Sequence, residues 1–183
     1  MRVLGFDPGM ERLGFGIVDT DPFDLTYMGV IANPPDHTKG WNENVDAGIK
    51  NITEQFPRIM MLYDPQVIVS ELLPPGKLGS RSETTRAAIS TCKAMAYLYG
   101  IPWINYGANT IKETIAGDGT ASKARVRNAI LELFPQWKIK HQDEKNKQKK
   151  EGLKRPPGIP QDAFDGAAAA VTHIWKTNGK DSV

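Results

Sequence analysis

The chain has 183 residues, of which 40% are hydrophobic and 24% charged, a composition that fits one compact domain with a full core rather than two. No apolar run approaches the roughly 18 to 20 residues of a membrane span, and Met1 leads almost directly into a short apolar run without a signal peptide, so we expect a cytosolic protein that binds no membrane. The formal net charge is only +2, but residues 136–158 hold seven Lys and one Arg against three acids. That segment therefore carries +5, which leaves −3 for the remainder.

The first predicted element is a buried strand over residues 3–7. It is an apolar run that ends in the carboxylate of Asp7 and is stopped by Pro8-Gly9. Residues 67–71 repeat this design and end in Glu71, with prolines and a glycine following. Burying an unpartnered carboxylate costs several kcal/mol, so both acids should face a cleft or a cation. Ligands of open α/β sheets bind at this carboxyl edge.

The elements between and after these two strands predict a mixed five-stranded sheet with flanking helices. Two further strands joined by short turns form an antiparallel meander, and the long helix that follows, which Pro57 bends or splits, carries the chain across in a right-handed crossover. Asp7 and Glu71 then lie on neighbouring parallel strands. The two meander strands are predicted over 13–19 and 25–31, and the long helix over 42–62. The remaining predicted elements are strand 101–106 and helices 82–99, 109–116 and 122–134.

The single cysteine, Cys92, lies in an Ala-rich helical stretch. It can form neither an internal disulfide nor a cysteine metal cluster, and we interpret it as a core thiol. His37 and His141 lie in polar stretches and are expected at the surface, whereas His173 follows the last acids by two helical turns and is expected to pack rather than to act.

The basic segment 136–158 lacks apolar periodicity and ends in Arg155-Pro156-Pro157-Gly158. It predicts a flexible loop, either solvated surface or a DNA-contacting arm.

Asp162 and Asp165 open the last predicted helix, which begins after Pro160 and continues through four alanines to Trp175. Three residues apart, the two carboxylates point the same way and are favoured by the helix macrodipole. Such a pair is often simple capping, but the small residues behind it allow the helix to lie close against the sheet. Four carboxylates without a Cys or His cluster would form an oxygen-only site suited to Mg²⁺ or Mn²⁺.

Four motifs in this order resemble the RuvC family of Holliday junction resolvases. They are Gly5-Phe6-Asp7-Pro8-Gly9, Val69-Ser70-Glu71, residues 117–123 (GDGTASK) and Asp162-Ala163-Phe164-Asp165-Gly166-Ala167. The resemblance implies a ribonuclease H-like fold, a homodimer, and paired Mg²⁺-dependent nicks at four-way junctions.

By the same resemblance, each site contains about two ions, for which Mn²⁺ could substitute. Asp7, Glu71, Asp162 and Asp165 match the family's catalytic, metal-binding tetrad, and Lys112 and Lys123 match its basic residues near the scissile phosphate, with Lys123 in a catalytic role.

The chain departs from the family in two places. Leu72-Leu73-Pro74-Pro75 offers no aromatic residue to wedge into the junction, and residues 136–158 look like an insertion, as in a phage-type member. The basic side chains of that insertion are candidate DNA contacts, namely Lys138, Lys140, Lys145, Lys147, Lys149, Lys150, Lys154 and Arg155.

Other functions stay open at this point. A looser DNA contact would suit a broader debranching nuclease, and a protein of this fold could bind junctions without cutting them. A ribonuclease H uses the same tetrad. An actin-like or sugar-kinase ATPase also begins with an Asp-x-Gly loop, but it needs two such domains.

Overall fold

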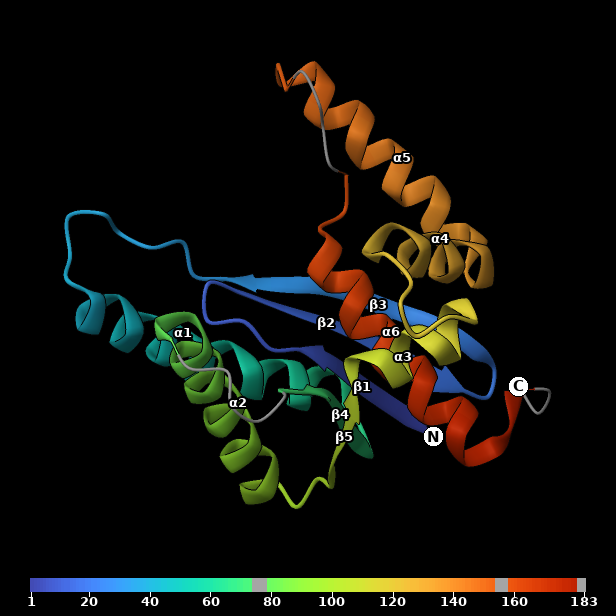
Figure 1. Cartoon of the computed structure of the whole chain (residues 1–183), viewed down its shortest axis with the longest axis horizontal. Helices are drawn as coiled ribbons and strands as arrows, with labels where there is room; N and C mark the ends of the chain where they lie inside the picture. Colours follow the sequence, from blue (N-terminus) through green and yellow to red (C-terminus); the bar gives the residue numbers. More distant parts are fainter. Residues whose placement is uncertain (74–78, 154–157, 181–183) are drawn as a thin grey trace.

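The computed structural model describes residues 1–73, 79–153 and 158–180, and it shows a five-stranded mixed sheet covered by helices on both faces (Figure 1). The strand order is β3-β2-β1-β4-β5. The strands are β1 (Arg2–Asp7), β2 (Arg12–Thr20), β3 (Phe23–Ala32), β4 (Val67–Leu72) and β5 (Trp103–Gly107). The helices are α1 (Trp41–Tyr63), α2 (Ser80–Leu98), α3 (Ala108–Ala116), α4 (Lys123–Leu133), α5 (Pro135–Lys150) and α6 (Gln161–Asn178). The predicted fold class is confirmed.

The sheet places the ends of β1 and β4 side by side. β1 pairs antiparallel with β2 and parallel with β4, and β4 pairs parallel with β5. Phe6 is in register with Ser70, so Asp7 and Glu71, the next residues on the two strands, leave the sheet at the same edge. The predicted antiparallel meander and parallel crossover are both present.

Two hydrophobic cores lie on opposite faces of the sheet. One contains α1 and α2 residues such as Phe56 and Cys92, and the other contains residues of α3, α4 and α6. Cys92 is fully buried and burial raises the pKa of its thiol, as expected for a core residue. α1 runs unbroken through Pro57, so the prediction that this proline could split the helix is wrong. None of the described helices is long and apolar enough to span a membrane.

α6 lies against the sheet at backbone distance because glycines of β2 and of α6 face the backbone of the opposite element. A Cβ on Gly14 would lie 1.9 Å from the Asp162 carbonyl oxygen, and one on Gly166 would lie 2.6 Å from the Phe15 Cα. Ala163 and Phe164 are fully buried in the same contact. The small residues of α6 therefore bring its first turn to the end of β1, as the run of alanines predicted.

The prediction of a basic loop over 136–158 is wrong for its first part. Residues 135–150 form α5, which extends away from the sheet (Figure 1). Pro135 occupies the first turn, where a missing N–H costs nothing, and the segment that follows is rich in Lys and Gln, good helix formers. Apolar periodicity is weak because only Trp137 and His141, one turn apart, are buried among the described α5 residues. Residues 154–157, including Lys154 and Arg155, lie outside the described chain.

Candidate active site

Three carboxylates converge where β1 meets the first turn of α6. Asp7, Asp162 and Asp165 each offer an oxygen, and these oxygens lie within 4.8 Å of one another. β1 delivers Asp7 as its last residue, and α6 supplies the other two from adjacent positions on one face. The predicted convergence of the strand and helix acids is therefore present.

The convergence shifts the titration of the central acid. Burial, with the negative charges of Asp165, Glu71 and Asp162, raises the pKa of Asp7 to about 7, and Lys123 opposes the shift. A nearby cation would stabilise the ionised form of Asp7, because it would offset the repulsion between the carboxylate oxygens packed together.

Glu71 lies beside this cluster rather than within the set of three. It lines a cavity of about 40 Å³ with Asp165 and two lysines, Lys112 of α3 and Lys123 of α4. All four predicted tetrad residues thus gather at one edge of the sheet, with Glu71 on its β4 side.

Lys123 contacts the acidic cluster directly. Its Nζ donates to Asp165 Oδ2 at 2.6 Å, and although burial opposes the charge, the Asp165 hydrogen bond and charge raise the pKa of Lys123. Ser122, the predicted cap, accepts a hydrogen bond from Arg125 N and so begins α4 at this point. The turn before α4 therefore fixes the lysine at the site.

Two residues that the sequence did not single out hold the α6 acids. Arg12 Nε donates to Asp162 Oδ2 at 2.7 Å, and Gln161 Nε2 donates to Asp165 Oδ1 at 3.0 Å. Arg12 comes from the start of β2, 150 residues away in sequence, so no local pattern connects it to Asp162. Its position three residues after Gly9, close to the strand that ends in Asp7, was the one available signal.

The histidines lie away from the acids. His173 is buried and its Nδ1 lies 3.1 Å from the Tyr106 hydroxyl, so the expected packing role is confirmed, and His37 is exposed as predicted. His141, expected at the surface, is buried instead: it packs edge-on against Phe164, and its Nδ1 accepts a hydrogen bond from Ile159 N. Its polar sequence neighbours concealed this contact with distant residues.

The chain matches the family described as crossover junction endodeoxyribonuclease RuvC over residues 3–146. It belongs to the RuvC family. The match ends within α5, so the geometry above, rather than the match, brings Asp162 and Asp165 to Asp7. This RuvC-family chain is 27% identical over 186 residues to the Pseudarthrobacter chlorophenolicus crossover junction endodeoxyribonuclease, covering 100% of this chain and 84% of that one. It is 27% identical over 182 residues to the Neisseria meningitidis protein, covering 98% and 88%.

Solved structures show the same RuvC fold. Thermus thermophilus RuvC superposes with a TM-score of 0.69 at 22% identity, over 97% of this chain and 95% of that one. The same protein in complex with a Holliday junction substrate gives 0.70 at 22% identity, over 97% and 94%. The yeast mitochondrial Holliday junction resolvase Ydc2 gives 0.61 at 17% identity, over 98% and 80%.

The predicted DNA-binding lysines lie in two places. Lys112 and Lys123 flank the acids, as described above, and the other predicted lysines that the structure describes lie along α5. Lys140 Nζ lies over the Trp137 ring at 4.2 Å, Lys138 and Lys145 line a cavity against α4, and the last turn holds Lys147, Lys149 and Lys150.

Proposed function

We propose that this chain is a structure-selective endonuclease that resolves four-way DNA junctions by metal-dependent hydrolysis of phosphodiester bonds. The observation that carries the proposal is the convergence of Asp7, Asp162 and Asp165 at one strand end in a chain of the RuvC family. The relatives' description as crossover junction endodeoxyribonucleases and the junction complex of the Thermus protein support the substrate class.

The donor set fits hard divalent cations. All the converging donors are carboxylate oxygens, which suit Mg²⁺ or Mn²⁺ rather than zinc. Asp7, Glu71, Asp162 and Asp165 would hold two such ions, with Mg²⁺ the expected metal. When bound, the ions supply the activation of a water and neutralise charge on the leaving oxygen.

The cationic and amide side chains around the acids have distinct roles in this proposal. Lys123 and Lys112 place positive charge where a scissile phosphate would approach the cavity beside Glu71. Arg12 and Gln161 orient Asp162 and Asp165 through the hydrogen bonds described above, so that both α6 carboxylates keep their oxygens toward Asp7.

The chain would act as a homodimer of a single ribonuclease H-like domain, because two opposed nicks in a two-fold junction call for two symmetric sites. The lysines of α5, with Lys154 and Arg155, would contact the phosphates of the junction arms.

The test is cleavage of a labelled immobile four-way junction beside a linear duplex, a replication fork and an RNA–DNA hybrid, each with Mg²⁺, with Mn²⁺ and with a chelator. Paired, symmetric, metal-dependent nicks in the junction alone are expected. Equal cutting of the fork would make the chain a general debranching nuclease, tight junction binding without nicks would make it a binding protein, and preferred cutting of the hybrid would make it a ribonuclease H.

A further inference from the structure

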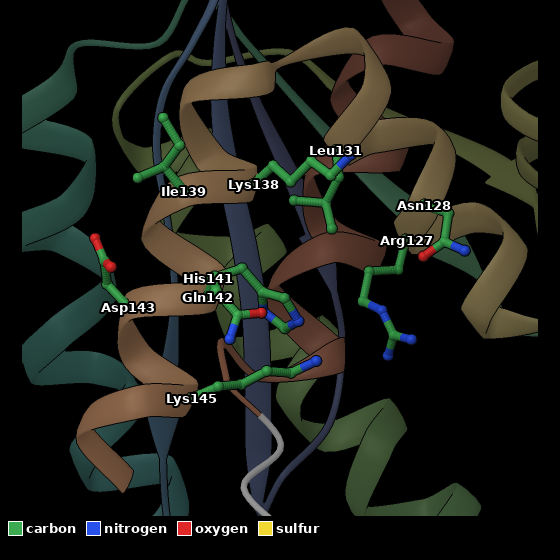
Figure 2. A pocket seen from close by; sticks show the side chains of 9 residues that line it. All are labelled: Arg127, Asn128, Leu131, Lys138, Ile139, His141, Gln142, Asp143 and Lys145. Carbon is green, nitrogen blue, oxygen red and sulfur yellow. The ribbon is translucent and has the colours of Figure 1, made fainter. Parts of the chain in front are cut away.

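A cavity of about 530 Å³ lies between α4 and α5, outside the acidic site. Its wall carries three cationic side chains, Arg127 of α4 and Lys138 and Lys145 of α5. Figure 2 shows Arg127 and Lys145 reaching into the cavity from its two sides, with the His141 ring beside Lys145. Asp143 is the one acid among the described side chains that line it, and it points away from the space between Arg127 and Lys145 (Figure 2).

The other polar groups of the wall can act as hydrogen-bond donors. His141 Nδ1 accepts from Ile159 N at 3.0 Å, which leaves the proton of the neutral ring on Nε2. Arg127, His141 and Lys145 line the same cavity, and burial with the positive charges of Lys145 and Arg127 lowers the pKa of His141. The side-chain amide of Asn128 adds a further NH2 group, whereas Gln142 Nε2 already donates to Asn146 Oδ1 at 3.1 Å. A wall of nitrogen donors with a net positive charge suits the oxygens of a phosphodiester.

The cavity also adjoins the acidic site. Arg127 follows Lys123 by four residues on α4, about one helical turn or about 6 Å further along. Both residues contact the N-terminal end of α6: Lys123 binds Asp165, and Arg127 NH1 donates to Gln161 Oε1 at 3.2 Å. A DNA strand with one phosphate at Lys123 would therefore bring a neighbouring backbone phosphate to Arg127.

We infer that the α4–α5 cavity binds a backbone phosphate of the DNA strand that flanks the cleaved bond, held between Arg127 and Lys145. The inference rests on the proposed function for its substrate, and it distinguishes these two residues from the lysines at the exposed end of α5. It also gives α5 a function that a mobile basic tail could not have, because Trp137 and His141 fix the helix, and with it Lys145, in position opposite α4.

The first test is the double variant Arg127→Gln with Lys145→Gln, against a control that removes the same charge elsewhere, Lys50→Gln with Lys176→Gln. Lys50 is exposed on α1, on the other face of the sheet, and Lys176 is exposed in the last turn of α6. Junction affinity is measured in chelator at several salt concentrations, after thermal melting has shown that both variants fold.

The cavity variant should raise the junction Kd about 10-fold, since charge-assisted hydrogen bonds are lost, and flatten the slope of log affinity against log salt by roughly 0.9 for one lost phosphate contact. The control should stay within about 2-fold of the parent protein. Equal effects of the two variants would overturn the inference. Cleavage by the parent protein is scored separately, so tight binding without nicks would reject the proposed function and leave the cavity result standing.

The second test does not remove a charge. Gln142→Cys places a thiol on the cavity wall, and its alkylation can be followed because Cys92 is buried. A bound four-way junction should slow alkylation about 10-fold at residue 142 and leave Lys50→Cys unaffected. Unchanged alkylation at residue 142 with saturating junction would mean that DNA does not enter the cavity.

Discussion

The acidic end of the sheet and the basic helix α5 carry opposite charges and are fixed by different forces. Asp162 and Asp165 lie on a helix that contacts the sheet at backbone distance through Gly14 and Gly166. α5 instead extends from the body of the protein (Figure 1) and is anchored by Trp137, whose Nε1 donates to Leu25 O at 2.7 Å, and by His141.

Because the two regions are fixed in different ways, they should tolerate different substitutions. Packing that excludes even a methyl group fixes the acids to a fraction of an ångström, as metal coordination requires. Most α5 side chains are exposed and act through charge, which falls off gradually with distance in water. Changes at the acidic end should therefore have large and local effects, and changes on α5 small and cumulative ones.

The largest effect is expected from Asp7→Asn. Losing one stabilising group in an active site costs about 10²–10³-fold, so removal of the central carboxylate of a metal site should lower junction nicking by about 10³-fold while binding stays within about 2-fold. Single-turnover nicking and gel-shift affinity are compared with Asp46→Asn, an exposed acid on α1. Normal nicking by Asp7→Asn would remove the acidic cluster from the active site.

The raised pKa of Asp7 predicts a pH effect on stability. Its folded pKa of about 7 lies above the ordinary 3.8, so the folded protein holds this proton more tightly and loses stability as pH rises from 3.8 through 7. Without metal, the advantage in unfolding free energy of Asp7→Asn over the parent protein should grow by roughly 3 kcal/mol between pH 5 and pH 8.

Urea denaturation in chelator measures this change, and added Mg²⁺ should stabilise the parent protein but not the variant. An advantage independent of pH would show that Asp7 titrates normally.

The close contact of α6 predicts a smaller loss. Gly166→Ala adds a methyl group that would meet the Phe15 backbone at 2.6 Å, so the helix must shift, and stability should fall by about 1–3 kcal/mol. Gly48→Ala is the matched control, since it also lies in a helix but its added methyl would meet the flexible end of Met10. Chemical denaturation of both variants tests whether the backbone contact matters, and equal stability would show that it does not.

A still smaller effect is expected from Arg12→Gln. Asp162 would lose its ion pair and some of its orientation, and nicking should fall about 10-fold without a change in melting temperature. Arg125→Gln breaks a similar pair with Asp118 away from the acids and should leave nicking unchanged. If both variants nick equally well, Arg12 has no role in positioning Asp162.

The acidic end could be predicted from the sequence because its determinants are local. Each acid lies at the end of an apolar strand or at the start of a small-residue helix. Parallel pairing of β1 and β4 is sufficient to place the two strand ends at the same edge of the sheet. Arg12 could not be found in this way, because its partner Asp162 becomes a neighbour only after the whole chain has folded.

The prediction of a loop for the basic segment is wrong because the determinants of α5 are not local. Its helix has only two buried positions, Trp137 and His141, too few for a periodic pattern, and the burial of His141 depends on Phe164 and Ile159 of a later segment. The charge of this segment predicts contact with phosphates, which stays a prediction, but the cavity against α4 requires the helix. Sequence patterns therefore located the acidic cluster, whereas the shape of the α4–α5 cavity depended on long-range packing.

The smallest effects are expected at the exposed end of α5. Lys147→Gln and Lys149→Gln, taken singly, should each raise the junction Kd only about 2- to 3-fold, because an exposed ammonium in water neutralises a phosphate incompletely. The two losses should multiply in the double variant, and they should weaken binding to a linear duplex as much as to the junction, since neither lysine lines the α4–α5 cavity. Anisotropy titrations with both DNAs give the ratio directly. A loss confined to the junction would mean that the end of α5 recognises the branch itself. It would contradict the view that the exposed lysines of α5 act only through charge, whereas the acidic end acts through fixed geometry.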